Sequence, residues 1–171
     1  MKLLFLDIDG VLNSSDWARR RTVKANPHGS PAELAEFLID PKAIARVNDV
    51  LDRTGALVVL SSAWRLGNSE RWMEAKEMLY SAGLKPKTIV GRTPDLTIKL
   101  GSIHIAPDRG DEIGSYLKSM RECGRAIEAY AAVDDTSMRG DSVKGRLVLT
   151  DMSYGLVDEH VERLVDLLGE V

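Results

Sequence analysis

Several features that define large classes of protein are missing from this sequence. It has one cysteine, Cys123, so no intramolecular disulfide can form and a disulfide-stapled scaffold is excluded. Its three histidines show no ligand spacing, which argues against a zinc site. No apolar run approaches the roughly 18 residues that a membrane-spanning helix needs. The Gly-x-x-x-x-Gly-Lys-Ser/Thr loop of many kinases is also missing, so no kinase half is present.

Length, charge and the first residues are typical of a soluble domain. The 171 residues fit one domain, 1–171. The net charge of −3 gives no general attraction to nucleic acid or to an anionic membrane. The apolar start of the chain meets Asp7 and Asp9 after a few residues, which is unlike a signal peptide. We therefore expect a cytoplasmic protein that does not associate with a membrane; the sequence carries no signal for its oligomeric state.

Short apolar runs alternate with segments of helical periodicity. The runs, typical of strands buried on both faces, cover residues 2–7, 56–60, 87–90, 129–133 and 146–150. The helical segments cover residues 41–53, 68–82, 108–122 and 158–168. This alternation predicts an α/β fold, a Rossmann-like parallel sheet with helices on both faces. Segments 13–40 and 91–107 do not follow the pattern, and we expect them to be long functional loops that form a small cap or lid.

Polar side chains follow three of the predicted strands where those strands end: Asp7, Asp9 and Gly10 after the first, Ser61 and Ser62 after the second, and Asp134 and Asp135 after a later one. The carboxyl ends of parallel strands share one edge of a sheet, so four carboxylates are expected to converge there. Carboxylates that are close together repel unless a cation lies among them, and Mg²⁺ prefers such oxygen ligands. The alternative is that these residues only form turns or cap helices.

These residues resemble the motifs of the haloacid dehalogenase-like (HAD) superfamily, which consists mostly of phosphatases and phosphotransferases. Asp7-Ile8-Asp9-Gly10-Val11-Leu12 is similar to its first motif, and Ser61 resembles the second. Arg109 resembles the third, with Lys99 as the alternative, and Asp134-Asp135 resembles the fourth. The motifs occur in the order that the superfamily has, and they span most of the chain.

The resemblance implies a mechanism and a cofactor. Asp7 would be the nucleophile that forms an aspartyl-phosphate, and Asp9 would protonate the leaving alcohol and then activate water. Ser61 would hold a phosphoryl oxygen, Arg109 would neutralise charge on the transferring group, and Gly10 would allow a tight backbone path beside the phosphate. Asp7, Asp134, Asp135 and the carbonyl of Asp9 would hold Mg²⁺; which of Asp134 and Asp135 contacts it directly is left open.

The substrate is suggested by Ser61-Ser62-Ala63-Trp64-Arg65. This run resembles a pattern in the HAD domain of RNA-repair proteins and, more loosely, the phosphatase domain of polynucleotide kinase-phosphatase. It implies RNA or DNA ends as partners, with Ser62 at the phosphate, Trp64 stacked on a base and Arg65 on a phosphate. Alternatively, Trp64 packs under the sheet edge and Arg65 is solvated.

Other functions are compatible with parts of the sequence. A small-metabolite phosphatase of the same superfamily would share the mechanism, and a non-catalytic module would bind phosphate without turnover. A signalling receiver domain also gathers acidic residues, but its paired acids lie at the first strand and its acceptor at a later one. The arginines at 19–21 are either a contact for nucleic acid or a solvated helix face.

Overall fold

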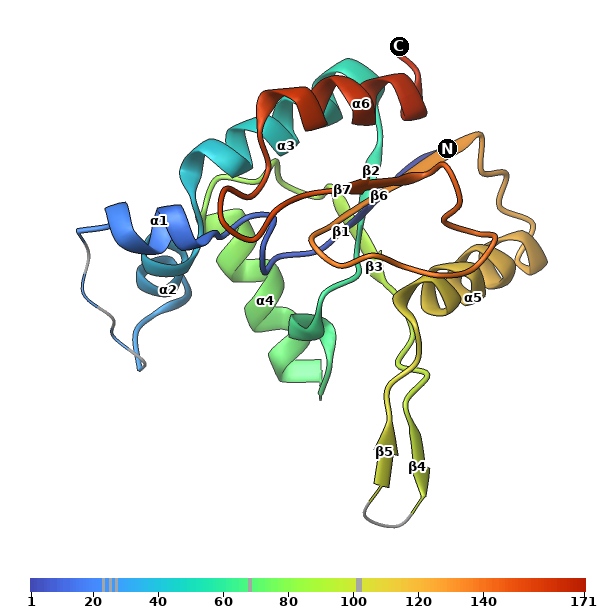
Figure 1. The fold of residues 1–171 in the computed structure, drawn as a ribbon, viewed down its shortest axis with the longest axis horizontal. Coiled ribbons are helices and arrows are strands. Elements are labelled where there is room, and N and C mark those ends of the chain that lie inside the picture. The colour runs from blue at the N-terminus through green and yellow to red at the C-terminus, as the bar shows by residue number, and fades with distance from the viewer. Residues whose placement is uncertain (23, 25, 27, 68, 101–102) are drawn as a thin grey trace.

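A parallel sheet of five strands forms the centre of the protein (Figure 1). The computed structural model describes the chain except residues 23, 25, 27, 68, 101 and 102, and it describes only the backbone of 99, 100, 103 and 104. The strand order is β3-β2-β1-β6-β7. The strands are β1 (Lys2–Leu6), β2 (Leu57–Leu60), β3 (Ile89–Arg92), β6 (Ala129–Asp134) and β7 (Leu147–Leu149). The predicted α/β fold is confirmed.

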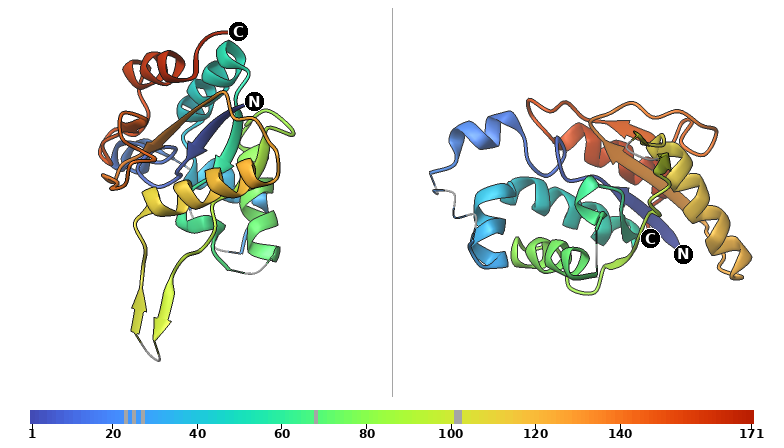
Figure 2. Two further views of the ribbon diagram at one scale, coloured as in Figure 1. Left: turned by 90° about the vertical axis from the view of Figure 1, so that its right-hand side faces the viewer. Right: turned by 90° about the horizontal axis from the view of Figure 1, so that it is seen from below.

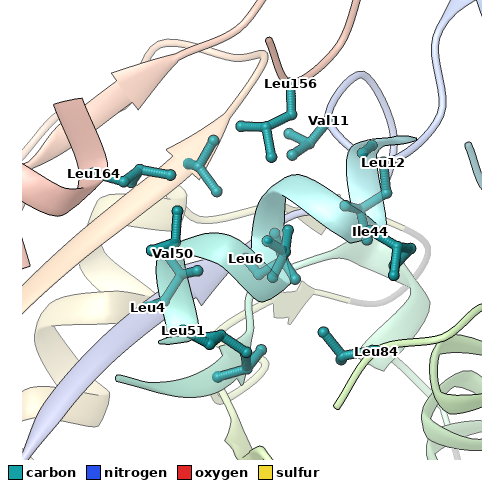
Figure 3. Packing of buried hydrophobic residues seen from close by; sticks show 14 of the residues in the cluster. Leu4, Leu6, Val11, Leu12, Ile44, Val50, Leu51, Leu84, Leu156 and Leu164 are labelled. Atoms are coloured by element: carbon teal, nitrogen blue, oxygen red, sulfur yellow. The ribbon is translucent and has the colours of Figure 1, made fainter. Parts of the chain in front are cut away.

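Helices cover both faces of this sheet (Figures 1 and 2). On one face α3 (Pro41–Thr54) and α6 (Asp158–Leu168) lie side by side, and α5 (Arg109–Glu122) covers the other. Leu4 and Leu6 pack toward α3 and α6 (Figure 3), whereas Leu3 and Phe5 pack toward α5. These four side chains of β1 are fully buried, which explains why residues 3–6 form an uninterrupted apolar run.

Segment 13–40 is not the long loop that we expected. It contains α1 (Ser15–Arg20) and α2 (Pro31–Leu38). The side chain of Ser30 accepts from the amide of Glu33, and the Glu33 carboxylate accepts from the amide of Ser30. This capping box, with Pro31 at the first helical position, is a start signal that the sequence displays. The helical pattern of α2 was missed because the helix is short.

Segment 91–107 also contains regular structure. Strands β4 (Ile98–Leu100) and β5 (Ile103–Ile105) pair antiparallel, and the hairpin extends away from the sheet (Figures 1 and 2). The 3₁₀ helix η1 (Ala63–Arg65) and α4 (Ser69–Ser81) connect β2 to β3. No helix within the described residues is long and apolar enough to cross a membrane.

The first turn of α6 is held by a hydrogen bond that forms only while His160 is neutral. The amide of Val157 donates to Nδ1 of His160 over 3.2 Å, so that nitrogen must be unprotonated. Burial lowers the pKa of His160 below its ordinary 6.5, against the opposing effect of Glu159. Because the folded protein favours neutral His160, this stability is fully present above pH 6.5 and is lost as the pH falls through the lowered pKa.

His160→Asn is expected to make the free energy of unfolding depend less on pH, because asparagine offers a hydrogen-bond acceptor that does not titrate. Urea unfolding between about pH 7 and about pH 5 would measure the free energy of unfolding of both proteins. The matched control is His28→Asn, at an exposed histidine. Parallel pH profiles for wild type and His160→Asn would contradict the assignment.

Candidate active site

The site lies at the carboxyl ends of β1 and β6, which are neighbours in the sheet. Asp7 directly follows β1, and Asp134 is the last residue of β6. The amide of Asp7 donates to the carbonyl of Val133 over 3.1 Å, so the backbone pairing continues up to the site. The chain leaves β1 toward β2 on one side, while β6 lies on the other. This is the topological switch point at which open α/β sheets bind ligands.

Three carboxylates converge there. One oxygen each of Asp7, Asp134 and Asp135 lies within 4.8 Å of the others. Asp7 and Asp134 are 1% and 0% exposed, and Asp135 is half-buried. Hard carboxylate oxygens in such a group suit a divalent cation, so the residues fit a metal site.

The carboxylate of Asp9 lies outside this cluster. It accepts from Nδ2 of Asn13 and from Nε1 of Trp64, each over 2.8 Å. The expected convergence of four carboxylates is therefore corrected to three. The cause is the turn after β1, in which the side chain of Asn13 also accepts from the amide of Gly10 over 3.0 Å.

Arg109 bridges two of the acids. Its Nη1 lies 2.7 Å from Oδ2 of Asp7 and 2.5 Å from Oδ2 of Asp134. Arg109 opens α5, whose N-cap residue Asp108 accepts from the amide of Gly110 over 2.8 Å. The structure therefore brings Arg109 into the site. The alternative residue, Lys99, belongs to β4, and its side chain lies outside the described part of the chain.

Burial and mutual repulsion disfavour ionised acids here. Burial raises the pKa of Asp7, and Arg109 and Ser62 oppose this rise. Burial and the charge of Asp7 raise the pKa of Asp134 to about 6, again against Arg109. Arg109 has a raised pKa because the attraction of the two carboxylates outweighs its own burial. A cation bound here would favour the ionised form of both acids.

Two polar atoms at the site have no protein partner. Oδ1 of Asp7 and Oγ of Ser61 are buried and accept or donate no hydrogen bond among the described residues. Ser61 is 1% exposed, and its amide donates to the carbonyl of Leu6 over 2.9 Å, which fixes it beside the end of β1. Buried polar atoms normally have a hydrogen-bond partner. Two such atoms without a protein partner at the same edge of the sheet therefore fit a site for a ligand or ion.

Gly10 is required by a close approach. Its φ is +71°, and a Cβ at this position would lie 2.3 Å from Oδ2 of Asp135. The carbonyl of Gly10 accepts from Oγ1 of Thr150 over 2.8 Å, which holds the turn in place. The sequence predicted a glycine beside a phosphate; the structure adds that the glycine makes room for the carboxylate of Asp135.

The predicted substrate residues after β2 have structural partners. Ser62 is fully buried, and its hydroxyl accepts from the amide of Trp64 at the start of η1. Trp64 is half-buried, packs against the core and donates to Asp9.

Arg65 requires a correction. It is 3% exposed and forms a buried ion pair with Glu112 of α5. Its guanidinium also donates to the carbonyls of Ser62, Thr93 and Pro94. It is therefore neither solvated nor directed at a substrate phosphate. It ties the end of β2 to the helix that carries Arg109, and the local sequence gave no sign of its partner Glu112.

Comparison with known families decides the assignment. The model of the HAD domain in Swiss Army Knife RNA repair proteins matches residues 3–161. The chain belongs to this HAD family. Membership implies phosphatase-type hydrolase chemistry, and HAD proteins generally use a divalent metal, for which the three acids are suited. No curated protein matches the chain, and no solved structure matches it.

Gly10→Ala is expected to weaken binding of a divalent metal to this HAD domain, because the new methyl group would displace Asp135. The thermal shift produced by titrated Mg²⁺ or Mn²⁺ would measure the loss, about 10- to 100-fold in affinity. Gly124→Ala is the matched control, since Gly124 has a φ of +72° but no atom within 4 Å of an added Cβ. Equal metal affinities in the two variants would show that the contact between residue 10 and Asp135 does not control metal binding.

Proposed function

We propose that this HAD domain is a Mg²⁺-dependent phosphomonoester hydrolase that works through an aspartyl-phosphate on Asp7. The observation that carries the proposal is the state of the Asp7 carboxylate. One oxygen pairs with Arg109, whereas the buried Oδ1 has no partner among the described residues. A carboxylate held by a cation on one side and unpaired on the other suits a nucleophile.

The first step transfers the phosphoryl group to the enzyme. Oδ1 of Asp7 attacks phosphorus, the bond between phosphorus and the ester oxygen breaks, and Asp9 gives its proton to the leaving oxygen. Arg109 stabilises charge on the transferring group, and the Ser61 hydroxyl donates to one of its oxygens.

The second step returns the enzyme to its starting state. Asp9 takes a proton from a water molecule, the water oxygen attacks phosphorus, and the bond to Asp7 breaks to release inorganic phosphate. Asp7, Asp134 and Asp135, with the carbonyl of Asp9, would hold Mg²⁺. The ion would supply positive charge against the phosphate oxygens.

Phosphorylated RNA or DNA ends, or nucleotides, are the proposed substrates. The family to which the chain belongs is described from RNA repair proteins, and the Ser-Ser-Ala-Trp-Arg run supports the same choice. The arginines at 19–21 add little: Arg20 pairs with Asp16 and Asp40, and the guanidinium carbon of Arg21 lies 3.5 Å from the ring centroid of Phe37. Small metabolites are the second candidate substrates.

Phosphate release from a panel, with and without Mg²⁺, tests this function. The panel holds 3′- and 5′-phosphorylated oligonucleotides, mononucleotides, sugar phosphates and an aryl phosphate. We expect Mg²⁺-dependent release chiefly from the nucleic-acid substrates. Release chiefly from sugar phosphates would keep the mechanism and reject nucleic acid, and metal binding without any release would favour a non-catalytic module.

Asp7→Asn is expected to abolish turnover, because an amide does not attack phosphorus. The assay is phosphate release with Mg²⁺ on the best substrate of the panel. Asp166→Asn, at an exposed residue of α6, is the matched control and should retain wild-type activity. Full activity in Asp7→Asn would refute the covalent mechanism.

Arg109→Ala is expected to lower kcat by about 10²- to 10³-fold, the usual effect of losing a group that stabilises transition-state charge. Lys99→Ala should have a far smaller effect. The measurement is kcat for both variants at saturating Mg²⁺. The reverse ranking would transfer the role of the third motif to Lys99.

A further inference from the structure

A cavity of about 440 Å³ is lined in part by Asp9 and by none of the three metal-site acids. Its walls come from α2, η1 and α4. Most of the lining is apolar, and it includes Pro31, Leu34, Ala63, Trp64, Ala75 and Met78. Asp9 lines this cavity, whereas Asp7, Ser61 and Arg109 do not.

The position of Asp9 gives the cavity a role in the reaction. In the proposed mechanism Asp9 gives its proton to the oxygen that leaves phosphorus, so the group attached to that oxygen must lie next to Asp9. This cavity lies on the Trp64 side of the Asp9 carboxylate, whereas a second cavity lies on its Asn13 side. We propose that the cavity on the Trp64 side receives the leaving group of the phosphate ester, and that this group carries a flat heterocyclic ring, as a nucleoside does. This inference rests on the proposed function and adds the leaving group to it.

Size and chemistry favour such a ring. The volume lies in the range of about 300–1,000 Å³ that is usual for small-molecule sites, and mainly apolar walls with a few polar groups are typical of them. Trp64, Pro31 and Leu34 are each partly exposed and offer apolar surface to the faces of a ring. Arg71 and Glu74 add charged side chains to the wall, which suit a ring edge that both donates and accepts hydrogen bonds.

The contact between Trp64 and Asp9 links the cavity to the acid. Nε1 of Trp64 donates to Oδ2 of Asp9 over 2.8 Å, and both residues line the cavity. A ring that occupies this space therefore lies against the side chain that orients Asp9. An alcohol without a ring would reach Asp9 but leave the apolar walls in contact with water.

Ala63→Trp tests the proposal by filling the cavity. Ala63 is exposed on η1, and a tryptophan there would occupy the space from one wall. Leu34→Trp narrows the cavity from the α2 side. An effect that both variants share cannot come from a local distortion at one of the two positions. Ala126→Trp, exposed in the segment just before β6, is the matched control.

The readout is the ratio of kcat/KM for a nucleoside monophosphate to kcat/KM for glycerol phosphate, each with Mg²⁺. We expect both cavity variants to lower this ratio about tenfold or more, and Ala126→Trp to leave it unchanged. An unchanged ratio in both cavity variants would overturn the proposal. Equal sensitivity of phenyl phosphate would overturn the heterocyclic part, because phenol has no comparable ring edge.

Oxygen-18 exchange between inorganic phosphate and water separates this inference from the proposed function. Exchange needs Asp7 and the metal but no organic leaving group. Exchange in wild type together with an unchanged substrate ratio would reject the cavity alone. No exchange and no phosphate release from any ester would reject the hydrolase itself.

Discussion

The burial of two carboxylates at adjacent strand ends constrains the rest of the site. Asp7 and Asp134 are held in the interior by the pairing of β1 with β6, where each alone would favour its protonated form. Positive charge must therefore be brought to them, and Arg109 at the start of α5 supplies it. The position of α5 depends in turn on contacts with the segments that follow β2 and β6. Arg65 pairs with Glu112 one turn along the helix, and a Cβ on Gly110 would lie 1.9 Å from the carbonyl oxygen of Arg139, so the helix end sits tightly on the loop after β6.

The site contains two groups of residues that are held in place differently, which we call the floor and the wall. The floor consists of residues fixed by the sheet: the two buried acids and Ser61. Asp9 belongs instead to the wall, because its carboxylate is oriented by Asn13 and Trp64. That division matches the two chemical tasks of the proposed reaction. The nucleophile has to be stationary relative to the metal and Arg109, whereas the proton donor has to meet a leaving group that differs from one substrate to another.

Most of the fold could be predicted from the sequence, because strands buried on both faces and amphipathic helices leave strong local patterns. Asp7, Ser61 and Asp134 therefore lie at strand ends, as the apolar runs predicted. The direction of the Asp9 side chain and the partner of Arg65 could not be predicted, since both depend on residues brought close only by the folded chain. The helix α2 is a different case. Its capping box at Ser30 was visible, but the surrounding loop-like composition concealed a helix of eight residues.

The topology of the parallel sheet determines when this site can form during folding. Its groups follow β1, β2 and β6 and open α5, so they are far apart in the chain and come together only after long-range strand pairing. Such pairing is slow, because distant segments must close before they gain contacts. The carboxylate cluster therefore cannot form before β1 pairs with β6. A divalent ion that binds this cluster would bind only the completed fold, so its binding would report native structure and stabilise it by an amount that rises with the logarithm of the ion concentration once this exceeds Kd.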